Sequence, residues 1–278
     1  MNKSGANSIW RAILALLVTS SLATSQQAGK DEKPMADDPP VGTGKLLLLE
    51  DFETTAAGQV PKGYQKQGAV AVVEDAAHSG RHSLKCDAAP NGARKITLKG
   101  DLLKELGGSF WGRLYFKVLT PTPDPEKVHS TFVAGAAKSP LHQDDIETRL
   151  FGTNLGAKGT YSYLFNVQPH TKRAEFGKSS AAKYSYKNEW TLAEWQVDNT
   201  TQTYRLFIDG AEIKDASFSK GAGNLEGSEL PDLYESLSFG FTNYQQAGKG
   251  FTVWIDDIAL AKDRVGTRGI PVAKSAKK

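Results

Sequence analysis

Hydrophobic and polar residues alternate in short stretches between residues 45 and 261. In the stretch 111–118, for example, Leu114, Phe116 and Val118 fall on one side of an extended chain, and Arg113 and Lys117 fall on the other. A period of two residues is typical of half-buried β-strands, and the helical period is nearly absent. The expected strands are 46–52, 69–73, 83–86, 94–98, 111–118, 128–134, 148–151, 161–167, 193–197, 204–208, 236–242 and 251–260.

Two local signals add detail to this pattern. Asp209 and Gly210 lie between two strand-like stretches, which is a strong signal for a β-hairpin. Residues 101–106 are the one stretch with the character of a helical turn. Many short antiparallel strands, with no helices to cover a parallel sheet, predict an all-β protein: an antiparallel β-sandwich of the jelly-roll, concanavalin-like kind.

The two ends of the chain differ from this middle part. Lys3 and Arg11 precede an apolar run at 12–18 and small residues up to Ser25, which predicts a cleaved signal peptide over residues 1–25. A membrane anchor is the alternative, but the run is shorter than a spanning helix needs. We expect a disordered leader at 26–44, the sandwich domain at 45–264 and a disordered basic tail at 265–278. The mature protein is then secreted or periplasmic and does not bind a membrane.

Composition and charge narrow the function classes. The chain has 278 residues and a net charge of only +3, which gives no reason to expect nucleic-acid binding. Its single cysteine, Cys86, excludes an intrachain disulfide. Neither the serine-hydrolase elbow nor the glycine-rich nucleotide motifs occur, so ester hydrolysis and nucleotide chemistry are not expected.

Three separated segments carry a first resemblance: Glu-Asp-Phe-Glu at 50–53, His-Ser-Gly-x-x-Ser at 78–83 and Ile-Asp-Asp-Ile at 255–258. Together they resemble secreted carbohydrate-active jelly rolls, in which the first and last strands pair and hold a structural calcium ion. The resemblance implies a Ca²⁺ bound by Glu53, by backbone oxygens of Ser79 and His82, and by the carboxylate of Asp256 or Asp257. Any one segment taken alone favours the alternative that these acids are solvated turn residues and that His82 is an ordinary surface histidine.

A second resemblance covers residues 46–265. Its short motifs lie at 110–115, 128–132, 147–152, 194–197 and 208–210, and they resemble the cellulose-induced secreted protein family of fungi and its bacterial relatives. That family is similar in fold to the glucuronan and alginate lyases. The resemblance implies a polysaccharide-active protein, with an acidic glycan as partner and no redox cofactor.

A uronate lyase must neutralise the substrate carboxylate, remove the C5 proton and protonate the leaving oxygen. His129, Arg149 and Tyr163 have suitable side chains and lie on three expected strands, so we predict them as catalytic residues. Each also has a plain structural alternative. His129 then lies at a sheet edge, Arg149 pairs with Glu147, and Tyr163 belongs to the core.

Further polar and aromatic residues lie on the side of their strands opposite the expected core. If these sides line one concave sheet, they form a groove for an anionic glycan. The predicted substrate-binding residues are Trp111, Arg113, Tyr115, Lys117 and Tyr244.

Two functions remain open at this stage. The first is β-elimination on a uronic-acid-containing polysaccharide. The second is non-catalytic carbohydrate binding or adhesion through the same concave face, with aromatic rings stacking on sugars. The Arg-x-Glu-Leu-Arg and Gln-Ile-His motifs of the alginate lyases do not occur in the chain.

Overall fold

The computed structural model describes residues 38–123, 128–139, 145–157, 159–170, 175–219, 230–245 and 248–270, without the side chains of 156 and 157. All of them belong to one compact unit, Pro34–Lys278. The predicted signal peptide, the leader up to residue 37 and the last eight residues of the predicted tail lie outside the described residues. In the described part of the chain, no helix is long and apolar enough to cross a membrane.

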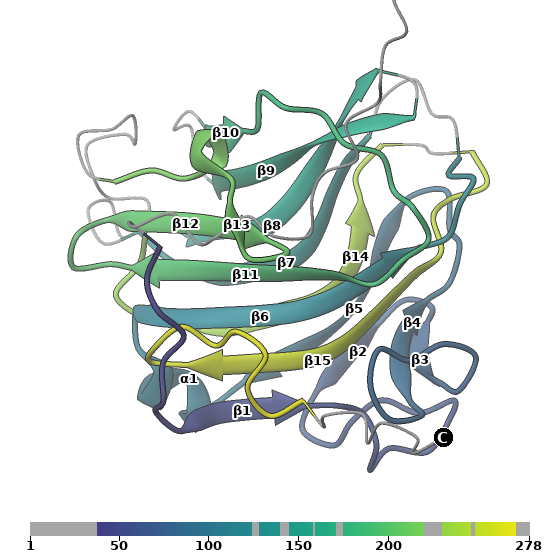
Figure 1. The fold of residues 1–278 in the computed structure, drawn as a ribbon, viewed down its shortest axis with the longest axis horizontal. Helices are drawn as coiled ribbons and strands as arrows, with labels where there is room; N and C mark the ends of the chain where they lie inside the picture. The colour runs from purple at the N-terminus through teal and green to yellow at the C-terminus, as the bar shows by residue number, and fades with distance from the viewer. Residues whose placement is uncertain are drawn as a thin grey trace, which may run out of the picture. The chain divides into compact units, whose positions relative to one another are not determined.

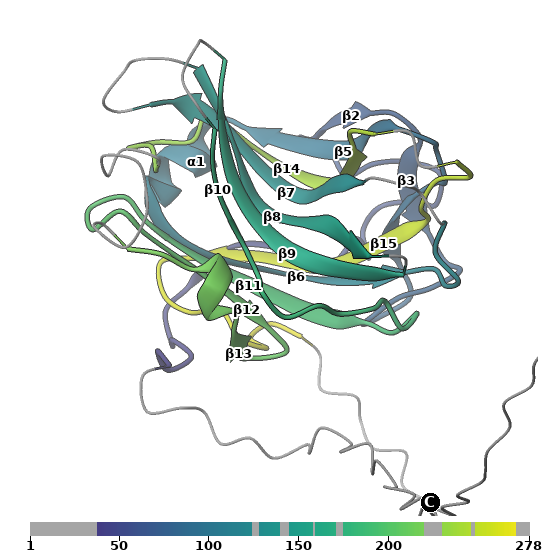
Figure 2. The ribbon, with the colours of Figure 1, turned by 90° about the horizontal axis from the view of Figure 1, so that it is seen from above.

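The described residues form two antiparallel sheets, which appear as two layers in Figures 1 and 2. In the eight-stranded sheet, the first strand of the chain, β1, pairs with the last strand, β15, so that Leu46 lies opposite Ala261. The order of the other strands is β13-β12-β11-β6-β15-β4-β3. Their bounds are β1 Leu46–Glu50, β3 Val70–Val73, β4 Ser83–Cys86, β6 Ser109–Val118, β11 Thr191–Asp198, β12 Thr203–Ile208, β13 Ala211–Glu212 and β15 Val253–Ala261.

The seven-stranded sheet has the order β10-β9-β8-β7-β14-β5-β2. Its strands are β2 Gln65–Gln67, β5 Gly92–Lys99, β7 His129–Lys138, β8 Asp145–Ala157, β9 Thr160–Pro169, β10 Phe176–Ser179 and β14 Ser236–Asn243. A short helix, α1 (Asp101–Leu106), and a 3₁₀ turn, η1 (Lys214–Ala216), complete the described elements. The predicted antiparallel β-sandwich is confirmed. The edge strands β2 and β10 were not expected, because they are short and lack alternation.

The core lies between the sheets and is rich in aromatic residues. Phe116 of the eight-stranded sheet packs against Phe132 and Phe151 of the other sheet, with ring centroids 4.9 and 5.3 Å apart. Phe132 also meets Phe241 edge-on at 5.1 Å. Tilted and edge-on contacts of this kind are favourable beyond the apolar area that they bury. The alternation in the sequence therefore predicted the inward side of these strands.

The predicted hairpin is also present. Ile208 pairs with Ala211 across the turn, and Asp209 and Gly210 have φ angles of 49° and 86°. Two successive positive φ angles define the turn type whose twist suits a two-residue hairpin, and Asp followed by Gly tolerates them. The hairpin fixes the position of Asp209 at the edge of the sandwich.

The outward side of the eight-stranded sheet differs from the expectation. Trp111, Arg113 and Tyr115, which we predicted to line a groove, are only 5%, 0% and 9% exposed. Trp111 packs in a second cluster with Phe207, Ala259, Ala261 and Val265. The reason is that residues beyond β15 fold back over Trp111 and Arg113, and the His78 ring stacks on Tyr115 with centroids 3.4 Å apart. This part of the side opposite the core is therefore covered and is not a groove.

The covering segment is held by a buried network. The Arg113 guanidinium donates to the backbone oxygens of Gly266 at 2.8 Å and Arg268 at 2.6 Å. Glu194 accepts from the Gly266 N–H at 2.7 Å. Gly42, in turn, donates to the Arg264 oxygen at 2.8 Å. Residues at both edges of the predicted domain, which we assigned to leader and tail, are thus packed in the structure.

Candidate functional site

The outward side of the seven-stranded sheet gathers polar residues from three strands and the loop after β14. On β8, Arg149 pairs with Asn166 of β9 and with Ala134 of β7, so these residues share one side of the sheet. The pairing of β8 with β9 shifts in register between Arg149 and Gly152. This irregularity turns the side chains that follow Arg149 back toward the core. We call this group the outer-face cluster; it comprises His129, Glu147, Arg149, Asn166, Gln168, Tyr244 and Gln245.

Arg149 lies at the centre of the cluster and is 5% exposed. Its guanidinium donates to the side-chain oxygens of Asn166 at 2.9 Å and Gln168 at 2.6 Å. Its Nε lies 3.6 Å from Glu147 Oε1 and has no hydrogen-bond partner in the described structure. The structural alternative, a pair with Glu147, is therefore present, but most of the hydrogen bonds of Arg149 go to neutral amides.

Tyr244 covers Arg149 and faces solvent. The Arg149 guanidinium carbon lies 4.3 Å from the centroid of the Tyr244 ring, a cation–π arrangement. The Tyr244 hydroxyl donates to Glu147 at 3.0 Å, and the side chain is still 39% exposed. Burial, together with the nearby Glu147 charge, raises the pKa of Tyr244, so its hydroxyl stays protonated at neutral pH. The result is a flat aromatic ring that is fixed from beneath and open above.

His129 lies beside this pair. Its backbone N–H donates to the side-chain oxygen of Gln245, and its ring Nδ1 lies 3.5 Å from Gln245 Nε2. Partial burial, and next the Arg149 charge, lowers the pKa of His129. A neutral imidazole at pH 7 is the form that accepts a proton.

A shallow hollow adjoins Tyr244 on the same side of the sheet. It is lined by Lys95, Thr131, Phe132, Ala134, Ser238, Gly240, Thr242 and Tyr244. Gly240 has a φ of 150°, and a Cβ there would lie 2.3 Å from the Arg94 backbone oxygen. Glycine at this position therefore allows β14 to lie close to the backbone of β5, and Lys95 lines the hollow beside it.

The predicted residues divide between the two sheets. The structure brings His129, Arg149 and Tyr244 together, while Trp111, Arg113, Tyr115 and Lys117 lie on the other sheet. Tyr163 points inward, where it stacks on Tyr184 at 4.0 Å, so its core alternative holds and Tyr244 is the tyrosine of the cluster.

Sequence reasoning did not single out Asn166 and Gln168. Asn166 and Gln168 lie two residues apart in a half-strand, 163–169, whose other residues are apolar or aromatic, a signal that the sequence does contain. Gln245 follows Tyr244 in the chain, but its contact with His129 depends on the folding of the sheet.

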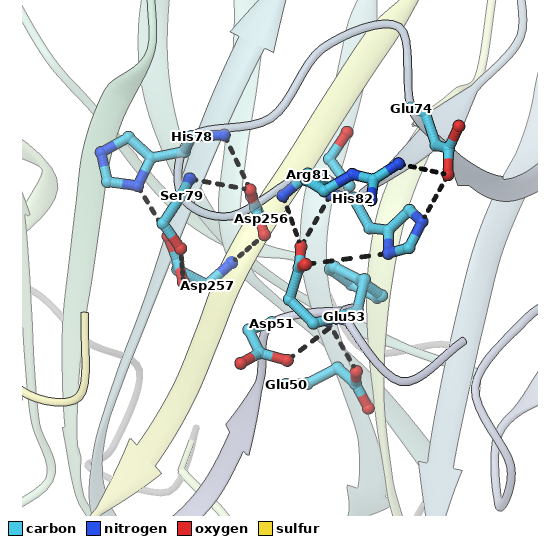
Figure 3. A network of polar contacts seen from close by, with 12 residues as sticks. Glu50, Asp51, Glu53, Glu74, His78, Ser79, Arg81, His82, Asp256 and Asp257 are labelled. Atoms are coloured by element: carbon cyan, nitrogen blue, oxygen red, sulfur yellow. Dashed lines mark hydrogen bonds and ion pairs between the residues drawn. The ribbon is translucent and has the colours of Figure 1, made fainter. Parts of the chain in front are cut away.

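The three segments predicted to hold calcium do converge (Figure 3). Glu53 Oε1 accepts from the backbone N–H groups of Arg81 at 2.8 Å and His82 at 2.7 Å. Asp256 Oδ2 accepts from the N–H groups of His78 at 2.7 Å and Ser79 at 3.3 Å. The turn thus directs N–H groups at the carboxylates, where the resemblance implied backbone oxygens around an ion.

Asp256 and Asp257 both approach this turn, which strict alternation does not allow. Asp257 has a φ of 49°, and the pairing of β15 with β6 shifts between Asp256 and Ala259, so a bulge turns both side chains the same way. Asp257 contacts His78 Nδ1 at 2.6 Å and accepts from the Ser79 hydroxyl at 2.9 Å. The sequence left open whether Asp256 or Asp257 faces the turn, and the structure brings both carboxylates to it.

Several features of this turn bear on the predicted calcium. Burial, with Asp257 adjacent, raises the pKa of Asp256 to about 8, because no cationic side chain compensates its charge. His82 Nδ1 is buried without a hydrogen-bond partner among the described residues. Carboxylate oxygens are the ligands that Ca²⁺ prefers. Within the described ranges, however, no group of three or more His, Cys, Asp or Glu side chains is arranged to hold a metal.

Comparisons with known proteins define the fold class. Neither a family model nor a curated protein sequence matches the chain. The cellulose-induced protein Cip1 superposes with a TM-score of 0.51 at 18% identity, over 79% of this chain and 99% of that one. The fold is therefore a β-sandwich of the kind found in Cip1, which confirms the resemblance at the level of fold.

More distant structural matches include toxin domains. One is from botulinum neurotoxin type C, whose cell entry depends on interaction with two ganglioside molecules (TM-score 0.49, 10% identity, 82% of this chain and 48% of that chain). Another is the binding domain of botulinum neurotoxin serotype G (TM-score 0.47, 10% identity, 79% and 48%). The chain spans about half the length of these toxin chains.

Proposed function

We propose that the protein binds an acidic polysaccharide on the outer side of its seven-stranded sheet. The observation that carries the proposal is the ring of Tyr244, which is 39% exposed on a polar sheet surface and is held flat by the Arg149 guanidinium beneath it. Such a platform suits the apolar face of a sugar ring. The polar side chains around it are placed to accept and donate hydrogen bonds to hydroxyl groups.

The preference for an acidic glycan rests on Lys95. Arg149 is too buried to meet a ligand carboxylate unless Tyr244 moves, whereas Lys95 lies at the side of the adjoining hollow. In the described structure, its ammonium group forms no ion pair. A uronate carboxylate next to the hollow would be attracted by the Lys95 charge while its sugar ring, or a neighbouring one, stacks on Tyr244. The predicted secretion of the chain agrees with an extracellular or periplasmic polysaccharide.

Removing the Tyr244 ring should weaken binding. We expect Tyr244→Ala to lower the affinity for oligoglucuronate by roughly five- to thirtyfold, equivalent to about 1–2 kcal/mol of lost stacking and burial. Tyr244→Phe keeps the ring and should cost less than about threefold. Isothermal titration calorimetry measures both. Leu119→Ala, at another exposed apolar side chain, is the matched control, and equal affinities for Tyr244→Ala and this control would refute the stacking platform.

A second candidate, β-elimination, is favoured by one observation. His129, with its lowered pKa, lies in the same cluster as Arg149 and the protonated Tyr244 hydroxyl. In this reaction a base removes the C5 proton, the C4–O bond breaks, a C4=C5 double bond forms, and an acid protonates the leaving oxygen. We assign the base to His129 and the acid to Tyr244.

The test of β-elimination is an ultraviolet assay for unsaturated product across a panel of uronate polymers. If the protein is a lyase, His129→Ala should lower turnover by about 100-fold or more while leaving binding nearly intact, because general base catalysis contributes on this scale. The rate should also rise with pH through a pKa below the usual value for histidine and then level off. If the wild-type protein binds the polymers but releases no unsaturated product, β-elimination is refuted and binding remains the proposed function.

A further inference from the structure

A cavity lies between the two sheets, under the segment that leads from β10 to β11. It has a volume of about 190 Å³. Phe116, Val118 and Ile208 form an apolar base, and the exposed residues Lys187, Glu189 and Asp209 lie at its mouth. This volume is far more than one water molecule needs and less than the roughly 300 Å³ at which drug-sized sites begin. The cavity therefore has room for one small ring.

Tyrosines form one wall of the cavity. Tyr163 stacks on Tyr184 with ring centroids 4.0 Å apart and an angle of 9°, and Tyr186 meets Tyr184 edge-on at 5.4 Å. The Tyr163 hydroxyl has no hydrogen-bond partner in the described part of the chain. Burial, the main cause, raises its pKa, so the hydroxyl stays protonated and serves as donor or acceptor. Tyr163 was predicted from the sequence as a catalytic residue, but it does not belong to the outer-face cluster.

Asp209 supplies a carboxylate at the mouth. The hairpin turn holds it at a φ of 49°, and its Oδ1 accepts from the Leu192 N–H at 2.9 Å. Its Oδ2 has no partner within the described ranges. The backbone contact fixes the orientation of the carboxylate, and the second oxygen remains available to a ligand.

We propose that this cavity binds a single neutral pyranose ring. The apolar base suits the C–H face of the sugar, and Asp209 Oδ2 and the Tyr163 hydroxyl suit two of its hydroxyl groups. Two carboxylates and one lysine at the mouth disfavour a uronate. A quaternary ammonium ligand is disfavoured as well, because Tyr163 and Tyr184 stack on each other and leave no gap between their rings.

This site is separate from the outer-face cluster. Tyr163 and Phe165 of β9 point into the sandwich, whereas Asn166 of the same strand lies with Arg149 on the outward side. The inference therefore does not rest on the proposed polysaccharide site, and either one can fail without the other.

The test is saturation-transfer NMR and calorimetry on the full chain with glucose, xylose, galactose and their methyl glycosides. Asp209→Asn keeps Oδ1 and tolerates the positive φ, and it should weaken binding about 10- to 100-fold through loss of a charge-assisted hydrogen bond. Tyr163→Phe should weaken it roughly three- to tenfold. Tyr64→Phe removes another buried, unpartnered hydroxyl outside the cavity and should leave binding unchanged.

Several results would overturn the inference. They are the absence of any response to neutral sugars at tens of millimolar, a preference for choline or glucuronate, and binding that neither cavity variant weakens. Displacement of the monosaccharide by oligoglucuronate would place both ligands in one site and also refute a separate cavity. Continued binding of the monosaccharide when oligoglucuronate is saturating would support it.

Discussion

Replacing Arg113 with methionine is expected to lower the free energy of unfolding by about 3–5 kcal/mol, because it leaves buried partners uncompensated. Arg113 is fully buried, and its Nε donates to the Asp257 backbone oxygen at 3.0 Å. Its other bonds tie down Gly266 and Arg268 in the covering segment. Methionine keeps the apolar stem but satisfies none of these three carbonyl groups. Urea unfolding with an unchanged m-value measures the loss.

Lys117→Met is the matched control for this change. Lys117 lies on the same strand and the same side as Arg113, but its ammonium group rests over the Trp254 ring at 5.6 Å and is not enclosed. We expect a loss below about 1 kcal/mol. Equal losses in the two variants would mean that the covering segment contributes little to stability.

The second large effect concerns pH and calcium. The pKa of Asp256 is raised to about 8 in the folded protein, against 3.8 as its ordinary value. Between these pH values the folded state binds more protons than the unfolded state, so metal-free stability should fall as pH rises from 5 to 8. The slope contributed by one such group is at most about 1.4 kcal/mol per pH unit. The stabilisation is complete below about pH 4 and lost above about pH 8.

Asp256→Asn should remove most of this slope in the presence of chelator, as followed by thermal melts. Asp101→Asn, at an exposed carboxylate whose Lys104 hydrogen bond lowers its pKa, should leave it unchanged. A slope that persists in Asp256→Asn would show that other groups cause the pH dependence.

We further propose that Ca²⁺ binds at the turn formed by Glu53, residues 78–82 and Asp256. An ion there would replace the proton on Asp256, so added Ca²⁺ should raise the melting temperature at pH 8 far more than at pH 5. Mg²⁺ provides the control, because it demands a stricter geometry. An identical melting temperature with Ca²⁺ and with chelator would refute the site and leave the carboxylates as direct partners of the turn.

The sequence predicted the strands well because burial on one side leaves a period of two that needs no tertiary information. It could not predict what covers the other side. Trp111 and Arg113 looked like groove residues, since the segment that buries them has Val265 as its apolar contact and is otherwise held by polar contacts that strand alternation does not reveal.

The candidate site was predictable only in part, for similar reasons. His129, Arg149 and Tyr244 were each identified, but strand alternation gives the side of a sheet and not the distance between residues. The sequence likewise brought the acidic segments together with the turn at 78–82, yet it does not specify whether a turn points N–H or C=O groups at a carboxylate. The bulge at Asp257 could not be predicted either, because no glycine or proline marks it in the sequence.

The place of β15 in the sheet has a consequence for synthesis of the chain. This last strand lies between β6 on one side and β4 and β1 on the other, although those three are translated far earlier (Figure 1). Until residues 253–261 leave the ribosome, the partners have open strand edges that favour pairing with other chains. The eight-stranded sheet is therefore completed only after residues 253–261 have been synthesised, and a transcript cut short before codon 253 should yield an aggregating product.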